Sequence, residues 1–285
     1  MSEQPTITRR GPLGRGVEQV GAAGRAVAGS ARGTVAFAGG AGYLLAETVR
    51  WALRGMFVPR VRFGIGALAG QMFRVGVLSI PIVVLVQMFI GIILVLQMAP
   101  TLASYGQLER VADVVGIAMF RELGPLIAAI VLSGFAGASI AAEIGAMVES
   151  EEIKALRAHA LNPIPFLVVP RITATVIMLM GLAIISDVVG VFGGYLTAVY
   201  LLDVPSSVYV EYTLFALRVR DFLTGLFKAG VFGMLISLIA CYEGMTVSGG
   251  AVGVGRATTS TVVKSIVALI VTDCAFTAVF YLFGL

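Results

Sequence analysis

The chain has 285 residues, of which 58% are hydrophobic and only 13% are charged, and its formal net charge is +4. Soluble domains usually carry about 25% charged residues, so this composition excludes a water-soluble globular protein and favours an integral membrane protein. The small net charge gives no indication of nucleic-acid binding. Cys241 and Cys274 both fall inside apolar runs, where we expect small buried side chains and no disulfide framework.

The N-terminal region is basic. Residues 1–34 are rich in Gly, Ala and Arg and lack the apolar core of a secretory signal peptide. We expect either an arm that contacts an anionic membrane surface or a tail without a role. Residues 36–57 place Glu47, Arg50 and Arg54 on one helical face, which predicts a helix in the membrane interface. An amphipathic helix packed on protein is the alternative.

Five long apolar segments follow, and each exceeds the roughly 20 residues that a helix needs to span a bilayer. They are residues 75–104, 113–147, 164–202, 222–246 and 259–283. With the N-terminus in the cytoplasm, 15 of the 20 Lys and Arg lie on the cytoplasmic side, which satisfies the positive-inside rule. The five on the opposite side are Arg110, Arg121, Arg218, Arg220 and Lys228. We therefore expect an all-α integral membrane protein with residues 35–285 as one domain and the C-terminus outside the cytoplasm.

The stretch from residue 119 to 171 combines a charged pair, an apolar run rich in small residues, and a charged segment. The pair is Arg121 and Glu122, just before a Gly-Pro, and the segment is residues 149–161. Arg121 and Glu149 would be about 42 Å apart along a helix, which is about the thickness of a bilayer with its headgroups. The pair and the segment are therefore expected on opposite sides of the membrane.

The segment 149–161 has acidic residues at its start and basic residues at its end, as the helix dipole favours. Ile153, Leu156 and Ala160 form a short apolar face, and Asn162-Pro163 ends the pattern. We expect a short amphipathic helix that fits a groove on a partner, with a merely solvated connection as the alternative. The residues expected to contact the partner are Glu149, Glu151, Glu152, Ile153, Leu156 and Arg157.

Two aspartates, Asp187 and Asp273, fall near the middles of the third and fifth spans. An unpaired charge at a bilayer centre costs about 2.5–3.5 kcal/mol or more. We expect these carboxyl groups to face the bundle interior, to be protonated, or to pair with Lys228 or Lys264. A proton relay and a structural hydrogen bond between helices are the two interpretations.

Several kinds of site are not predicted for this chain. Gly250 and Gly255 have the glycine spacing of a phosphate loop, but Arg256-Ala257 stands where Lys and Ser/Thr are needed. The single histidine, His159, and the lack of a Cys/His cluster predict no metal site. No nucleophile–base pair stands out, so we expect neither an enzyme nor a bound cofactor. Energy for any transport would come from a partner or an ion gradient.

Several motifs occur in order along the chain. They are RELGP at 121–125, AGASIAAEIGAM at 136–147, EEIKAL at 151–156, NPIPFLVVPR at 162–171 and GVGRATTSTVV at 253–263. Together they resemble the MlaE/YrbE permease family of lipid-transporting ABC systems, and the likeness covers nearly the whole chain. The chain departs from the commonest family pattern at Ser133-Gly134-Phe135 and at Ala158-His159-Ala160.

The resemblance implies a permease of an ATP-driven ABC transporter that moves phospholipids between the inner membrane and the periplasm or outer membrane. It implies a homodimer, a cytoplasmic ATPase that binds ATP and Mg²⁺ and docks at a coupling helix formed by residues 149–161, and a periplasmic MCE-domain protein, and it leaves an accessory subunit open. The lipid cavity implied between the two copies involves Leu94, Tyr105, Arg121, Glu122 and Leu123.

Alternatives remain for these assignments. Arg121 and Glu122 could form an ion pair that only orients the span. An ion-coupled secondary transporter that uses the intramembrane residues Asp187 and Asp273 is the second hypothesis for function, but the inverted repeats common in such proteins are not evident.

Overall fold

The computed structural model describes part of the chain: residues 37, 39–51, 54 and 65–284. These residues form helices joined by turns, with no β-strand among them. The chain divides into a short N-terminal unit, Met1–Leu45, and a helical bundle, Ala46–Leu285. The predicted basic arm lies outside the described residues, and the predicted interfacial helix is helical at each of its described positions.

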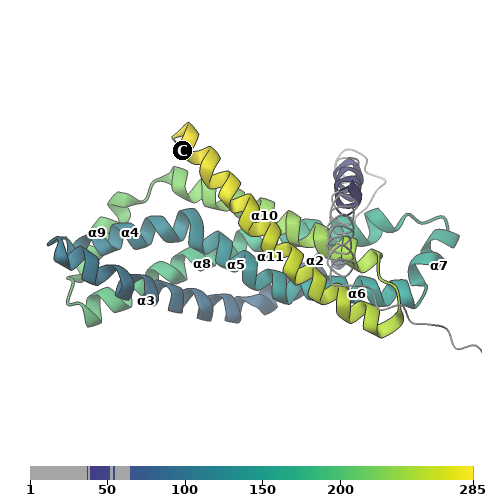
Figure 1. Ribbon diagram of the computed structural model, residues 1–285, viewed down its shortest axis with the longest axis horizontal. Helices are drawn as coiled ribbons and strands as arrows, with labels where there is room; N and C mark the ends of the chain where they lie inside the picture. Colours follow the sequence, from purple (N-terminus) through teal and green to yellow (C-terminus); the bar gives the residue numbers. More distant parts are fainter. Residues whose placement is uncertain (1–36, 38, 52–53, 55–64, 285) are drawn as a thin grey trace, which may run out of the picture. The chain divides into compact units, whose positions relative to one another are not determined.

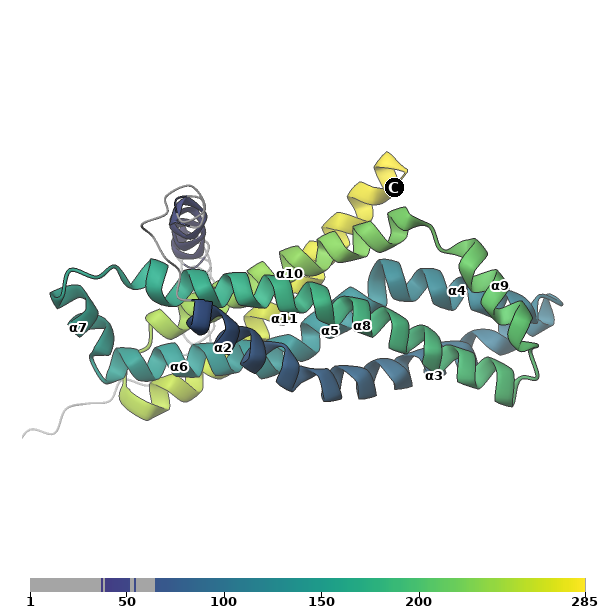
Figure 2. The same cartoon turned by 180° about the vertical axis from the view of Figure 1, so that it is seen from behind.

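The bundle is built from long helices with short irregular helical turns between them (Figures 1 and 2). In chain order these are α2 (Ile65–Val75), η1 (Val77–Ser79), α3 (Ile80–Ser104), η2 (Leu108–Arg110), α4 (Val111–Ala118), η3 (Met119–Leu123), α5 (Gly124–Leu132), η4 (Ser133–Gly137), α6 (Ala138–Glu149), α7 (Glu152–Ala158), η5 (Ile164–Val168), α8 (Val169–Leu201), α9 (Ser206–Ala216), α10 (Val219–Met245) and α11 (Gly250–Phe283).

Five helical runs in the described residues are long and apolar enough to cross a membrane. They are Leu68–Ser104, Leu108–Glu149, Ile164–Leu201, Val219–Met245 and Gly250–Phe283. All but the third begin several residues before the predicted segments, because glycines and polar or charged residues such as Gln71, Arg74 and Arg256 lower the hydrophobicity there without stopping the helix. The prediction of an all-α integral membrane protein with about five spanning helices is confirmed.

Prolines stand in the first turns of helical segments within the spans, at Pro81, Pro125, Pro165 and Pro170. Proline has no backbone N–H, so Pro81, Pro125 and Pro170 each remove one hydrogen bond within a continuous helical run. Pro165 stands at the start of its run, where that donor would have no helical partner. The segments η3 and η4 are π-helices, so the second span is not one uniform α-helix. Gln87 of α3 donates to the carbonyl of Gly124 at 3.1 Å, just before Pro125.

The helices α3 and α8 approach closely because glycines face each other. A Cβ on Gly91 would overlap the carbonyl of Gly190, and a Cβ on Gly193 would overlap the carbonyl of Met88. Small residues at such positions allow two backbones to pack tightly in lipid, where dispersion and hydrogen bonds, and not the hydrophobic effect, hold helices together.

The short helix α7 lies at one end of the bundle, and α9 lies at the other end (Figure 1). The predicted helix 149–161 is too long: Glu149 is the last residue of α6, and α7 spans only Glu152–Ala158. Glu151 has a left-handed backbone with φ of 61°, which breaks the helix before α7. After α7, Ala160 is also left-handed, with φ of 59°, and the Leu161 N–H donates to the Leu156 carbonyl at 3.0 Å. This Schellman turn, not Asn162-Pro163, ends the helix.

Gly91→Ala is expected to lower the melting temperature in detergent by several degrees, because the added methyl group would overlap α8 and such overpacking costs roughly 1–3 kcal/mol. Gly181→Ala is the matched control, since no atom lies within 4 Å of a Cβ there. The control should keep or slightly raise the melting temperature, because alanine forms helix better than glycine. Equal shifts for the two variants would contradict the close packing of α3 and α8.

Candidate functional site

Three spans bring oppositely charged side chains together inside the bundle. Glu122 lies in η3, Lys228 in α10 and Asp273 in α11. Lys228 Nζ donates to Glu122 Oε2 at 2.6 Å and to Asp273 Oδ1 at 2.9 Å. We call these three residues the ion cluster. Its members come from distant parts of the sequence, so only the packing of the spans assembles it.

Two residues of α11, Thr277 and Phe280, complete the surroundings of Lys228. Lys228 Nζ donates to Thr277 Oγ1 at 3.1 Å and lies 5.7 Å from the centroid of the Phe280 ring. The Thr277 hydroxyl also lies 2.8 Å from Glu122 Oε1. An ammonium group has three N–H donors, so two carboxylates and one hydroxyl satisfy it, and the aromatic ring adds a cation–π contact.

The exposure of the ion cluster is uneven. The side chain of Lys228 is 1% exposed, that of Asp273 is 14% exposed, and that of Glu122 is 33% exposed. One ammonium faces two carboxylates, so the fully ionised cluster carries one surplus negative charge. An uncompensated charge is costly in apolar surroundings, and the surplus is tolerated best at Glu122 because that carboxylate is the most exposed. Glu122 is therefore where the cluster is accessible to another polar group.

The π-helix η3 sends its two charged side chains to different partners. Glu122 reaches Lys228, whereas Arg121 Nε lies 3.6 Å from Asp221 Oδ1, near the start of α10. The pair that is adjacent in sequence is thus divided between two polar environments.

A glycine on α10 allows Lys228 to reach η3. A Cβ on Gly225 would overlap the carbonyl of Phe120, so only glycine permits this approach of the two backbones. Lys228 follows Gly225 by three residues and therefore lies on the same face of α10. The close contact places its ammonium against Glu122.

Asp187 lies apart from the ion cluster. It is in α8, is 4% exposed, and its Oδ1 has no hydrogen-bond partner among the described residues. A Cβ on Gly124 would overlap this oxygen, so Gly124 makes room for the carboxyl group. The structure places Asp273, and not Asp187, beside Lys228. The other candidate lysine, Lys264, donates to Glu243 Oε1 at 2.6 Å.

The apolar residues proposed for a lipid cavity do not all meet. Leu94 and Leu123 both pack, partly buried, against a core cluster that includes Val95 and Met119. Tyr105, at the end of α3, is 76% exposed and does not belong to that cluster. Within one chain the structure therefore joins Leu94 with Leu123 and leaves Tyr105 apart.

Sequence reasoning missed further ion pairs toward the α7 end of the bundle. Glu143 accepts hydrogen bonds from Arg74 at 2.9 Å and from Arg171 at 3.1 Å, and Glu243 accepts one from Lys264. Both glutamates lie inside apolar spans, which is the same signal that singled out the two intramembrane aspartates. Applying it to glutamate would have found these residues.

Charged side chains face outward on α7, namely Glu152, Lys154 and Arg157, and so does Glu151 just before it. Ile153 is 7% exposed and packs within the chain, while Leu156 is half-buried. Ile153 therefore anchors α7 to the bundle instead of offering a surface. Lys154 Nζ donates to Glu151 Oε1 at 2.7 Å, and this hydrogen bond lowers the pKa of the Glu151 carboxyl and raises the pKa of the Lys154 ammonium.

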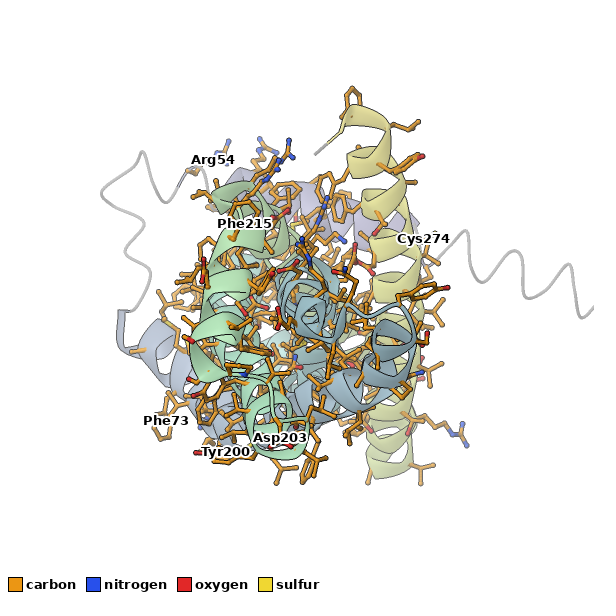
Figure 3. The ribbon with its side chains drawn as sticks, turned by 90° about the vertical axis from the view of Figure 1, so that its left-hand side faces the viewer. Arg54, Phe73, Tyr200, Asp203, Phe215 and Cys274 are labelled. Carbon is orange, nitrogen blue, oxygen red and sulfur yellow. The ribbon has the colours of Figure 1, made fainter. Side chains whose placement is uncertain are left out.

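The two cysteines differ in their surroundings. Cys241 is free and buried, as predicted, but Cys274 is free and exposed. The prediction of a buried Cys274 is wrong because α11 lies on the surface of the bundle, where Figure 3 shows this side chain. Within the described part of the chain, no group of three or more His, Cys, Asp or Glu side chains is arranged to hold a metal ion.

Lys228→Met should destabilise the bundle, because Glu122 and Asp273 would face each other without a cation. Breaking a buried ion pair costs about 3–5 kcal/mol, and solvent at Glu122 reduces that cost. Thermal unfolding in detergent should show a clearly lower melting temperature. The triple variant with Lys228→Met, Glu122→Gln and Asp273→Asn should recover most of the loss, since both carboxylates are then neutral.

Lys264→Met is the control for this experiment. Lys264 is also paired with a glutamate, but its side chain is 42% exposed, so its loss should matter less. A triple variant as unstable as Lys228→Met alone would mean that Lys228 stabilises the bundle by packing and not by charge.

Comparison with known proteins places this fold in a family. Residues 68–279 match the family model described as Permease MlaE. A probable ABC transporter permease protein of Rickettsia felis is 41% identical over 211 residues, which cover 74% of this chain and 82% of the relative. One of Synechocystis is 35% identical over 203 residues, or 71% of this chain and 77% of the relative. The family match extends from α2 to α11 and includes the ion cluster and α7. This chain belongs to the MlaE permease family.

Proposed function

We propose that this chain is the permease subunit of an ATP-driven ABC transporter that moves phospholipids between the inner membrane and the periplasm or outer membrane. A phospholipid has a charged headgroup and apolar tails. Its path through the protein therefore needs a polar group that contacts the headgroup and apolar side chains that contact the tails. Glu122 offers such a contact, because its side chain is 33% exposed. Its neighbour Leu123 packs, together with Leu94, against an apolar core cluster. This partly exposed carboxylate in an apolar bundle is the observation that carries the proposal.

A second copy of the chain would enclose the path. The helix α11 borders the ion cluster, yet only 6% of its most apolar stretch is buried within the described bundle. A surface of this kind suits contact with another copy, and Glu122 would then face a cavity between the two copies.

The short helix α7 is the proposed docking site for a cytoplasmic ATPase, which would bind ATP and Mg²⁺. It connects the second and third spans at one end of the bundle (Figure 1), so a force on α7 acts on both. Arg74, Lys154, Arg157 and Arg171 belong to this end, and the positive-inside rule supports its cytoplasmic placement.

The same proposed orientation has consequences for the termini and for the other parts of the transporter. The last helix, α11, runs away from the α7 end (Figure 1), so the C-terminus would be periplasmic and the N-terminus cytoplasmic. An MCE-domain protein would bind at the periplasmic end, and an accessory subunit is compatible with this arrangement.

The ion-coupled alternative is less well supported. It would use Asp187 and Asp273 as successive carriers, but Asp273 is engaged by Lys228, and Asp187 lies in a separate place beside Gly124. Transport that continues without an ATPase would nevertheless favour it over the ABC mechanism.

Charge reversal on α7 tests the ATPase contact. The variant with Glu151→Lys and Glu152→Lys should lose most co-purification with a co-expressed partner ABC ATPase, because it inverts the outward charge at α7. Folding should be retained, since both side chains are exposed. The matched control, Glu109→Lys with Glu211→Lys, reverses two exposed glutamates toward the α9 end and should keep the ATPase. Unchanged capture by the α7 variant would rule out α7 as the docking site.

Glu122→Gln tests the lipid path. The amide keeps the size of the side chain and can still accept from Lys228, whereas Glu122→Lys would set two ammonium groups side by side. Transfer of labelled phospholipid by the reconstituted transporter should fall several-fold, while assembly with the ATPase stays intact. Glu109→Gln, an exposed glutamate outside the ion cluster, is the control. Normal transfer by Glu122→Gln would reduce Glu122 to a structural role.

A further inference from the structure

Four arginines gather around one pocket at the end of the bundle away from α7. The pocket has a volume of about 300 Å³ and lies where α4 and η3 meet the turn between α9 and α10. Its charged lining consists of Arg110, Arg121, Arg218, Arg220, Asp113 and Asp221. We call it the arginine pocket. Figure 3 views the bundle from this end, with α9 crossing it from near Asp203 to Phe215, which borders the pocket.

The gathering of these arginines is not expected from their positions in the sequence. They are the four arginines that the sequence predicts on the side of the membrane opposite the cytoplasm, which carries only five of the 20 Lys and Arg. The positive-inside rule disfavours basic residues there, and scattered exceptions would have no common location. The structure instead places all four at a single pocket, which indicates a shared role.

The carboxylates of the arginine pocket are already engaged. Asp113 Oδ2 accepts a hydrogen bond from Arg110 Nη1 at 2.8 Å. Asp221 Oδ2 accepts one from the backbone N–H of Arg218 at 3.0 Å, which caps α10, and Asp221 Oδ1 faces Arg121. Four guanidinium groups against two carboxylates leave a surplus of two positive charges. The pocket therefore favours an anion.

Two of the guanidinium groups are held in position. Arg110 also lies over the ring of Tyr212, 5.0 Å from its centroid, and Arg220 Nη1 donates to the carbonyl of Gly284 at 2.9 Å. A guanidinium has five N–H donors in a rigid plane, so both groups keep donors beyond these bonds. Such planar donors match the oxygens of a phosphate group, and fixed donors lose little entropy when they bind one.

We propose that the arginine pocket binds a phosphate group, and specifically the headgroup phosphate of an anionic lipid in the leaflet at this end of the bundle. The pocket lies at the ends of spans, where headgroups lie, and Phe215 beside it is 82% exposed, as suits contact with acyl chains. The members of the ion cluster do not line it. The inference requires only that the chain spans a membrane, so it does not depend on the proposed transport of phospholipid.

The test measures lipid binding to the full chain purified in dodecyl maltoside. Fluorescent phosphatidylglycerol is titrated, with phosphatidylcholine as the zwitterionic comparison and inorganic phosphate as competitor. Arg218→Gln is the first variant, because its side chain is exposed and the backbone N–H that caps α10 remains. Arg110→Gln is the second. Arg256→Gln, an exposed arginine on α11 outside the arginine pocket, is the matched control.

Phosphatidylglycerol should bind about tenfold more weakly to Arg218→Gln and to Arg110→Gln, as expected for the loss of roughly 1.4 kcal/mol. Binding to Arg256→Gln should be unchanged, and phosphatidylcholine should bind wild type less tightly. Displacement of the lipid by inorganic phosphate would support recognition of the phosphate group. If phosphate binds and lipid does not, the phosphate site stands but its source is free phosphate.

Other results would overturn the proposal. Equal affinity in all variants, or equal loss in all of them, would show that lipid binding does not involve the arginine pocket. Intact lipid binding together with loss of an acidic protein partner from Arg218→Gln would reassign the pocket to protein docking. Neither result bears on ATPase capture through α7, so this test and that of the proposed function can fail separately.

Discussion

An ammonium group can remain inside a bundle of apolar helices only where carboxylates surround it, and this constraint fixes the packing around Lys228. Its donors require Glu122 from the second span and Asp273 from the fifth, so three spans must meet at one place. The glycine at 225 makes the approach of α10 and η3 sterically allowed. The need of the Lys228 ammonium for carboxylate partners and the close backbone approach at Gly225 therefore favour the same helix packing.

The π-helix η3 separates two polar environments of opposite charge. Glu122 contributes to the ion cluster, where carboxylates outnumber the ammonium, and Arg121 contributes to the arginine pocket, where guanidinium groups outnumber the carboxylates. Arg121 and Glu122, which are adjacent in sequence and opposite in charge, thus contribute one charge to each environment.

At the α7 end, a separate set of ion pairs joins the helices on either side of α7. Glu143 of α6 binds Arg171 of α8 and Arg74 of α2, and Ile153 anchors α7 itself. Three helices are thereby linked next to the short helix that we assign to the ATPase contact. A displacement of α7 would therefore act on these three helices together.

The sequence by itself determined the number and approximate limits of the spans, because hydrophobic length is a local property of the chain. It also singled out Glu122, as part of a charged pair before a Gly-Pro, and Asp187 and Asp273, since charges are rare in apolar runs. It could not show that Lys228 pairs with Asp273 and not with Asp187, that four arginines line one pocket, or that Cys274 is exposed. It also made α7 too long, since the left-handed backbone at Glu151 leaves no trace in hydrophobicity. These features were decided by tertiary structure, because ion pairing and burial depend on which faces of distant helices meet.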